Sequence, residues 1–282
     1  MFAYAIQHGY HPGPNPALSQ SINAGLPKAE QVRKTKHHEG VPYKKMFQFL
    51  RDLDECHHRG PLQCYEGTPP IVLCLKWVAY SGCRPGEATQ AQWNEIDEEN
   101  GIWTVPNDHL KMGRVHGEDK RVPISEEMQA LLEEAKEIAY PSESSKWQDR
   151  HKQRGVIFPR ARHAPDCSPD ALIFPNSVNE PFAEGRLARF MRDEMPAYRP
   201  AVPHGFRSTL QDWITGETDF PLKLWEIQAD HRGDKFKRSY GHDDHLERRR
   251  SMMKQYCRYI SQPRPEPKPG EVVKLKDKRR TA

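Results

Sequence analysis

The chain has 282 residues, enough for one large domain or two small ones. Apolar residues make up 36 % of it, below the about 45–50 % of typical globular chains, so part of the chain is expected to be extended. The sequence contains no run of about 18 apolar residues, so we expect no membrane span. Its start also lacks the basic region followed by an apolar core of a secretion signal, so we expect no export.

The net charge of +4 comes from the C-terminal tail. Residues 261–282 hold seven Lys or Arg against three Asp or Glu, so the rest of the chain is neutral. Bulk charge therefore does not indicate a nucleic-acid partner, and any such prediction must rest on the local placement of Arg and Lys.

The six cysteines are too scattered for a disulfide framework, and they favour a reducing, cytoplasmic location. The group Cys56, His57, His58 and Cys64 lacks the second pair of ligands that a zinc site needs. We therefore expect no metal site.

The N-terminal half is punctuated by polar stretches. Residues 2–9 could close a helix, and a polar linker follows to about residue 40. A helical pattern then runs from Pro42 to Leu53. A second helix over residues 70–80 is apolar nearly all round, so it should be central, and Gly82 should end it.

A β section comes next. Residues 93–96 and 102–105 flank Asn100-Gly101, which predicts a hairpin with a tight turn. A further strand is expected near residues 110–112 and a return strand over 121–124. Ser125 is placed to cap a helix that reaches residue 139.

The C-terminal half is mainly helical. Residues 140–170 are polar and basic and predict a long loop. Helices are expected over residues 184–192, 204–215, 222–229 and 244–260, and the Pro-rich tail after Ser261 should be disordered. The whole pattern predicts an α+β fold that is mostly helical, with a small antiparallel sheet on one side.

Chemically versatile side chains recur in four places. These are Arg84 in a tight loop, Lys111 in the hairpin, His204-x-x-Arg207 at a helix start, and His231 with Tyr240 nine positions later. Phosphoryl transfer needs such a set, because positioned cations stabilise charge on the phosphate oxygens and a tyrosine can attack phosphorus. Acidic clusters that would hold Mg²⁺ are lacking, so we expect no cofactor.

The order Arg, Lys, His-x-x-Arg, His, Tyr resembles the active site of tyrosine recombinases, and the local segments resemble their prophage-integrase branch. The likeness extends from about His8 to Tyr259. Three segments carry it: Arg84-Pro85-Gly86-Glu87 with residues 92–97, residues 103–112 with 122–125, and His204-Gly205-Phe206-Arg207-Ser208-Thr209.

The resemblance implies an enzyme that breaks and rejoins DNA without metal or ATP. Arg84 and Arg207 would hold the scissile phosphate, and His231 would bond one of its oxygens. Lys111 would protonate the leaving 5′-oxygen, His204 would assist proton transfer, and Tyr240 would form a 3′-phosphotyrosine bond. Glu87 would brace the site, through Arg84 or a histidine.

The resemblance also implies partners and domains. We expect double-stranded attachment-site DNA as the partner, a homotetramer on DNA, a monomer in free solution, and a cytoplasmic, nucleoid-associated location. Residues 1–40 would be the end of a core-binding domain with its linker, 41–260 the catalytic domain, and 261–282 a basic tail. Arg114, Arg121 and Arg232 are candidate DNA contacts.

Several alternatives stay open. Lys111 competes with Lys120, Arg114 and Arg121 in the same hairpin, and Tyr240 competes with Tyr256 and Tyr259. The basic run 248–250 could touch DNA or form a solvated surface. Asp230, before the third-box histidine, departs from the family pattern and should point away or pair with Arg232.

The function has alternatives as well. The chain could be a truncated prophage remnant that binds DNA but recombines poorly or not at all. It could also be a nicking–closing enzyme like the type IB topoisomerases, or an interaction protein that matches the boxes by chance.

Overall fold

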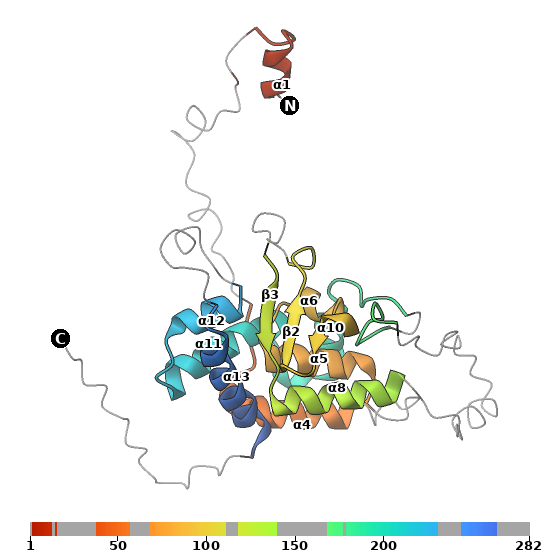
Figure 1. Ribbon diagram of the computed structural model, residues 1–282, viewed down its shortest axis with the longest axis vertical. Coiled ribbons are helices and arrows are strands. Elements are labelled where there is room, and N and C mark those ends of the chain that lie inside the picture. Colours follow the sequence, from red (N-terminus) through yellow and green to blue (C-terminus); the bar gives the residue numbers. More distant parts are fainter. Residues whose placement is uncertain are drawn as a thin grey trace, which may run out of the picture. The chain divides into compact units, whose positions relative to one another are not determined.

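The computed structural model describes residues 2–12, 15, 38–56, 68–110, 118–139, 168–176, 179–230 and 244–263. The chain divides into two units, Met1–His38 and Glu39–Ala282 (Figure 1). In the first unit, the described residues include one short helix, α1 (Phe2–Gln7), whose Phe2 and Tyr4 side chains are exposed. The predicted loop 140–167 and the tail from 264 lie outside the described residues.

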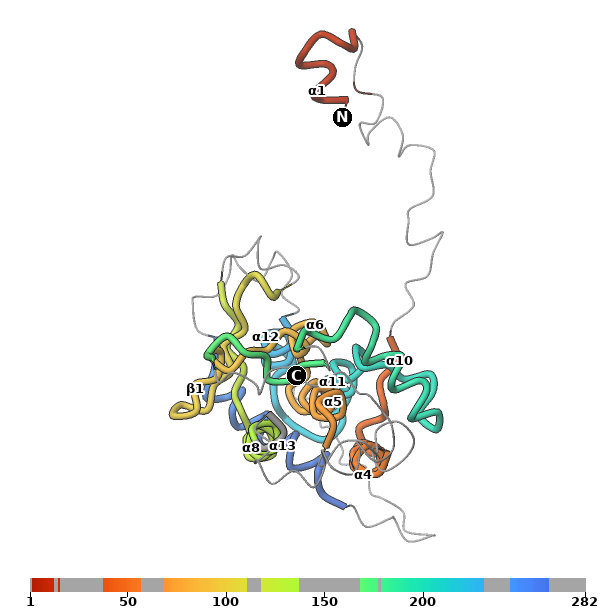
Figure 2. Tube along the Cα trace, turned by 90° about the vertical axis from the view of Figure 1, so that its right-hand side faces the viewer, coloured from red at the N-terminus to blue at the C-terminus, as the bar shows by residue number. Residues whose placement is uncertain are grey.

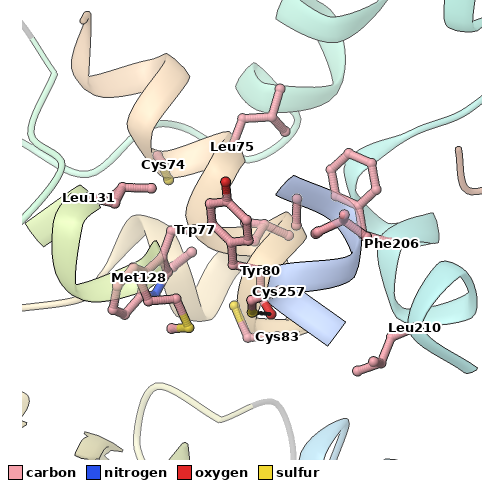
Figure 3. Packing of buried hydrophobic residues seen from close by; sticks show 14 of the residues in the cluster. Cys74, Leu75, Trp77, Tyr80, Cys83, Met128, Leu131, Phe206, Leu210 and Cys257 are labelled. Carbon is pink, nitrogen blue, oxygen red and sulfur yellow. Dashed lines mark hydrogen bonds between the residues drawn. The ribbon is translucent and has the colours of Figure 1, made fainter. Parts of the chain in front are cut away.

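Helix α5 (Pro70–Ser81) is central to the second unit, as its composition predicts. It is buried on nearly every side, so other helices must cover it. The helices α4 (Met46–Cys56), α8 (Glu126–Ala139), α11 (Phe206–Glu217) and α13 (Leu246–Ser261) all pack against it. Figure 3 shows side chains of α8, α11 and α13 meeting those of α5 in this core.

The end of α5 leads directly into the candidate site. Gly82 ends the helix in the left-handed region, at φ 62°, and its N–H donates to the carbonyl of Val78. The left-handed backbone favours glycine here, and a Cβ at this position would lie 2.7 Å from Leu210 Cδ2, so the end of that side chain would have to shift. The short helix α6 (Pro85–Thr89) follows with Pro85 in its first turn.

The sheet is small and antiparallel, in the order β1 (Ile96–Asp97), β2 (Ile102–Val105), β3 (Lys120–Pro123). Trp103 pairs with Val122, and both are buried. The turn is longer than the tight Asn-Gly turn that the sequence predicts, because residues 98–101 separate β1 from β2. Gly101 has φ 60°, and Asp97 accepts a hydrogen bond from the N–H of Asn100. The sheet lies to one side of α5, and α4 and α10 (Arg186–Glu194) lie to the other (Figure 2).

The hairpin prediction needs two further corrections. Residues 93–95 form a 3-10 helix, η3, rather than a strand, so the first strand begins only at Ile96. Leu110 lies in a bend outside the strands, and residues 111–112 lie outside the described residues. The return strand pairs with β2 as expected, and Ser125 caps α8 by accepting a hydrogen bond from Met128 N–H at 3.3 Å.

The 3-10 helices η1 (Tyr43–Lys45) and η5 (Pro203–Gly205) lie at the starts of predicted helices, and α12 (Leu222–Gln228) lies close to its predicted position. The 3-10 helix η4 (Pro196–Tyr198) is an addition to the predicted elements. Together with α10, α11 and α13 they confirm the helical C-terminal half, and the mostly helical α+β class is confirmed as well. None of the described helices has the length and apolar character needed to cross a membrane.

Candidate active site

The structure describes part of the predicted catalytic set. Arg84, His204, Arg207, Glu87 and Arg121 are described; Lys111, Arg114, His231, Arg232 and Tyr240 lie outside the described residues. Arg84 and Glu87 come from the start of α6, His204 from η5, Arg207 from α11 and Arg121 from β3. Of these elements, α6, η5 and α11 all contact α5.

Arg84 caps the start of α6 and is held on three sides. Its Nη1 donates to Glu87 Oε1 at 2.8 Å and to Asp230 Oδ2 at 2.7 Å, and its Nη2 donates to the Asp230 carbonyl at 2.8 Å. Burial alone would lower the pKa of Arg84, but the carboxylates of Glu87 and Asp230 outweigh it and raise the pKa. The guanidinium is therefore charged and fixed in direction.

Glu87 is buried between two cations. Its side chain is 1 % exposed, and Oε2 accepts a hydrogen bond from Lys120 Nζ at 2.7 Å. Burial acts to raise the pKa of Glu87, but the charges of Lys120 and Arg84 prevail and lower it. Glu87 is thus an anion that balances both neighbours.

Arg207 lies in the first turn of α11 and is 6 % exposed. Its Nη1 is buried, and within the described residues it has no hydrogen-bond partner. Burial lowers the pKa of Arg207, and the positive charge of Arg84 lowers it further. Because buried donors are normally satisfied, this arrangement suits an anion between the two arginines.

His204 lies in η5, the 3-10 turn that leads into α11. Its side chain is exposed while the flanking Pro203 and Gly205 are buried. A helical residue and the one three positions later share a face, so His204 and Arg207 lie on the same side of this helix start. The turn also packs tightly on the chain that enters the second unit, because a Cβ on Gly40 would overlap the carbonyl of Gly205.

Asp230 takes a position that its sequence context does not suggest. The sequence predicts that it points away or pairs with Arg232; its carboxylate pairs with Arg84, and Arg232 lies outside the described residues. The residue has φ 49°, a left-handed conformation that aspartate tolerates better than most residues. This places its carboxylate inside the cation cluster.

A second buried arginine, Arg249, was not foreseen. It is 1 % exposed, so it is neither a solvated residue nor a DNA contact. Its guanidinium donates to Gln228 Oε1, to the carbonyl of Arg121 and to both the carbonyl and the carboxylate of Asp244. Arg121 itself pairs with Asp244 through two hydrogen bonds and is half exposed.

The rival tyrosines are packed into the core. Tyr256 is fully buried, and burial raises its pKa well above the ordinary value. Tyr259 packs against Tyr43 and Trp213, with ring centroids 5.9 and 5.7 Å away. Both positions suit structural roles in α13 better than attack on a DNA phosphate.

The buried thiols offer no rival nucleophile near the arginines. Burial is the main cause that raises the pKa of Cys83 to about 12, so this thiol stays protonated at neutral pH. Among the described residues, no group of His, Cys, Asp and Glu is arranged to hold a metal ion. The members His57, His58 and Cys64 of the weak sequence cluster lie outside the described residues.

Two signals in the sequence could have found the residues that were missed. The alternation of β3 puts Lys120 on the same face as the buried Val122, with Arg121 on the exposed face. The helical period of α13 puts Arg249 on the face of Met253 and Tyr256. Neither signal identifies the partner of the buried cation.

Comparisons with known proteins agree on one kind of relative. Prophage integrase IntA of Escherichia coli K12 is 29 % identical over 182 residues, which are 64 % of this chain and 36 % of the relative. The integrase of Shigella phage Sf6 is 23 % identical over 220 residues, 78 % of this chain and 49 % of the relative. The chain thus spans between about a third and a half of the length of these two relatives.

The comparisons with family models and with solved structures give weaker results than the comparison with curated relatives. No family model matches the chain. A lambda integrase dimer bound to a COC′ core site is similar over 86 % of this chain and 71 % of its own chain, at 16 % identity and a TM-score of 0.48.

Proposed function

Because the chain belongs to the tyrosine recombinase family, as a relative of prophage integrases, we propose that it breaks and rejoins DNA through a 3′-phosphotyrosine bond. One observation carries this proposal. Arg84 and Arg207 come from separate helices into one buried cluster, and Nη1 of Arg207 has no partner among the described residues. A phosphate whose charge grows in the transition state would satisfy both cations.

The chemistry follows from the residue types. The phenol oxygen of Tyr240 attacks phosphorus while the bond from phosphorus to the 5′-oxygen breaks. Lys111 gives a proton to that leaving oxygen, and His204 assists removal of the phenol proton. Arg84, Arg207 and His231 stabilise the non-bridging oxygens, and the planar forks of the arginines suit two oxygens at once.

Rejoining is the same step in reverse. A 5′-hydroxyl of another strand attacks the phosphotyrosine and releases Tyr240, so the phosphate ester is conserved and no ATP is needed. No metal takes part in this scheme, because charged side chains stabilise the transition state.

The partner in this proposal is double-stranded attachment-site DNA. Exchange of strands between two sites requires four active protomers, so the active assembly is a homotetramer on DNA and the free chain a monomer. Arg114, Arg121 and Arg232 would contact phosphates; Arg121 is half exposed, which suits such a contact. The protein would act in the cytoplasm at the nucleoid.

The domain division is part of the same proposal. Residues 41–260 would form the catalytic domain, preceded by the end of a core-binding domain in 1–40 and followed by a basic tail in 261–282.

A suicide DNA substrate tests the reaction. The substrate is nicked beside the scissile phosphate so that the released strand diffuses away, and it is drawn from pooled candidate attachment sequences. Wild type should give a covalent protein–DNA adduct on a denaturing gel, and Tyr240→Phe should give none. Tyr259→Phe, which keeps its ring in the packing of α13, is the matched control and should still give the adduct.

The outcomes separate the alternatives. Equal adduct in wild type and Tyr240→Phe would remove Tyr240 as the nucleophile. Absence of adduct from every variant, together with retained DNA binding, would favour the inactive remnant. Relaxation of supercoiled plasmid without recombination would favour a nicking–closing enzyme.

A further inference from the structure

Lys120 is an unusual lysine. It is the first residue of β3, and its side chain is only 3 % exposed, although lysine is almost never buried without a partner. Its Nζ lies 2.7 Å from Glu87 Oε2, and that carboxylate is 1 % exposed. The pair is therefore shielded from water, and each charge depends on the other.

Glu87 connects Lys120 to Arg84 through its carboxylate. The oxygen that faces Lys120 also accepts a hydrogen bond from the backbone N–H of Arg84, at 3.2 Å, and the other oxygen accepts one from Arg84 Nη1 at 2.8 Å. The carboxylate thus bridges the two cations. Its orientation, and so the direction in which Oε1 faces Arg84, depends on Lys120.

From this geometry we propose that Lys120 is a positioning residue, which acts through Glu87 to hold the guanidinium of Arg84 in place for the DNA phosphate. The inference rests on the proposed function. The inference also gives Lys120 a different role from Lys111. The Nζ of Lys120 is ion-paired with a buried carboxylate, and it would have to break that ion pair before it could give a proton to a leaving oxygen.

Charged and titratable groups from several elements surround Glu87, and they define what a pH profile reports. They are Cys83 after α5, Arg84 at the start of α6, Lys120 on β3, Arg207 on α11 and Asp230 after α12. Burial raises the pKa of Glu87, and Lys120 is the strongest influence that lowers it. Without Lys120, Glu87 should take up a proton at higher pH and release its hold on Arg84.

The first test measures adduct formation by the full chain at saturating suicide substrate, across a pH series, with DNA affinity measured separately. Lys120→Met should slow adduct formation by about 10–100-fold, leave DNA affinity nearly unchanged, and move the acid limb of the profile to higher pH. Lys120→Arg keeps the charge and should restore most of the rate and the wild-type acid limb.

Lys136→Met is the matched control, because Lys136 also forms a 2.7 Å pair with a glutamate, Glu98, but near the surface. It should change neither the rate nor the pH profile. Because Lys120→Met leaves Glu87 without one partner and so lowers the stability of the fold, the double variant Lys120→Met/Glu87→Gln is included. It buries no unpaired carboxylate, and it should fold, react as slowly as Lys120→Met and show no shifted acid limb.

A second substrate distinguishes positioning from proton donation. Replacing the leaving 5′-oxygen by sulfur gives a thiolate, which leaves without a proton donor. This substrate should rescue a Lys111→Met variant but not Lys120→Met. Rescue of Lys120→Met would overturn the proposal and make Lys120 the proton donor, and so would a Lys120→Met rate that equals wild type.

The proposed function fails on different grounds. It fails if wild type gives no adduct or if Tyr240→Phe gives as much as wild type, whatever Lys120 does. An adduct that depends on Tyr240 but not on Lys120 would refute only the positioning role.

Discussion

The carboxylate of Asp230 lies 2.7 Å from Nη1 of Arg84, and the carbonyl of the same residue accepts from Nη2 at 2.8 Å. Both terminal nitrogens of the guanidinium are therefore engaged by the protein itself. These are the donors that a phosphate would use in a two-pronged contact. DNA must compete with Asp230 for Arg84 or share the fork with it.

Asp230→Asn should therefore bind DNA more tightly. The substitution removes a negative charge beside the phosphate position, and asparagine also tolerates the left-handed backbone found there. We expect about tenfold tighter binding, or roughly 1.4 kcal/mol, measured by fluorescence anisotropy at fixed salt. Asp193→Asn removes an equal charge from an exposed pair with Arg192 and should have little effect. Unchanged or weaker binding by Asp230→Asn would mean that the carboxylate helps to place Arg84.

Arg207→Met should lose activity without losing stability. The charged form of Arg207 is disfavoured in the folded protein, because burial and the charge of Arg84 both lower its pKa. Methionine removes that cost but also the phosphate contact. The melting temperature should stay level or rise, while adduct formation falls by at least about 100-fold. A marked drop in melting temperature would show that Arg207 has a stabilising partner after all.

Arg249→Met should behave in the opposite way. The guanidinium of Arg249 is fully enclosed and bonds Gln228 and Asp244, so removal leaves buried acceptors unpaired. We expect a loss of about 3–5 kcal/mol in the free energy of unfolding, measured with denaturant. Arg250→Met, on the same helix but partly exposed, should cost less than about 1 kcal/mol. Equal losses in the two variants would contradict this distinction.

Burial also makes stability depend on pH at Glu95. Burial raises the pKa of this carboxyl. The hydrogen bond from Trp103 and the charge of His109 act to lower the pKa, but burial prevails. The unfolded chain releases the proton first, at about pH 4.3, so stability falls as the pH rises from there through the folded value. Glu95→Gln can still accept from Trp103 and cannot ionise.

Thermal unfolding at several pH values checks this expectation. Glu95→Gln should match wild type at acid pH and exceed it near neutral pH. If the variant is less stable at neutral pH, the ionised carboxylate must gain more from His109 than burial costs it.

Local patterns were enough to predict much of the fold. The all-round apolar character of α5 and the glycine at its end predicted a buried helix that stops at Gly82, and Asn100-Gly101 predicted the turn between β1 and β2. The corrections arise where tertiary contacts decide. Residues 93–95 are predicted to belong to the first strand, but they form a 3-10 helix in which the N–H of Glu95 donates to the carbonyl of Gln92.

The candidate site was predictable as a set of residue types but not as a set of contacts. The pair Arg84 and Asp230 joins residues 146 positions apart, and no spacing rule selects one partner over another at that distance. Spacing does not rank Lys111 against Lys120 either, since both follow β2 in the same hairpin. Only the buried contact with Glu87 gives Lys120 a role of its own.

The tight packing of Gly40 on Gly205 has a mechanical consequence. The carbonyl of Glu39 accepts a hydrogen bond from Val202 N–H at 2.9 Å, directly before the turn that carries His204. The two backbones touch with no side chain between them, and a Cβ on Gly40 or on Gly205 would overlap the opposite backbone. A larger residue at either position would therefore push apart the start of the second unit and the turn that carries His204.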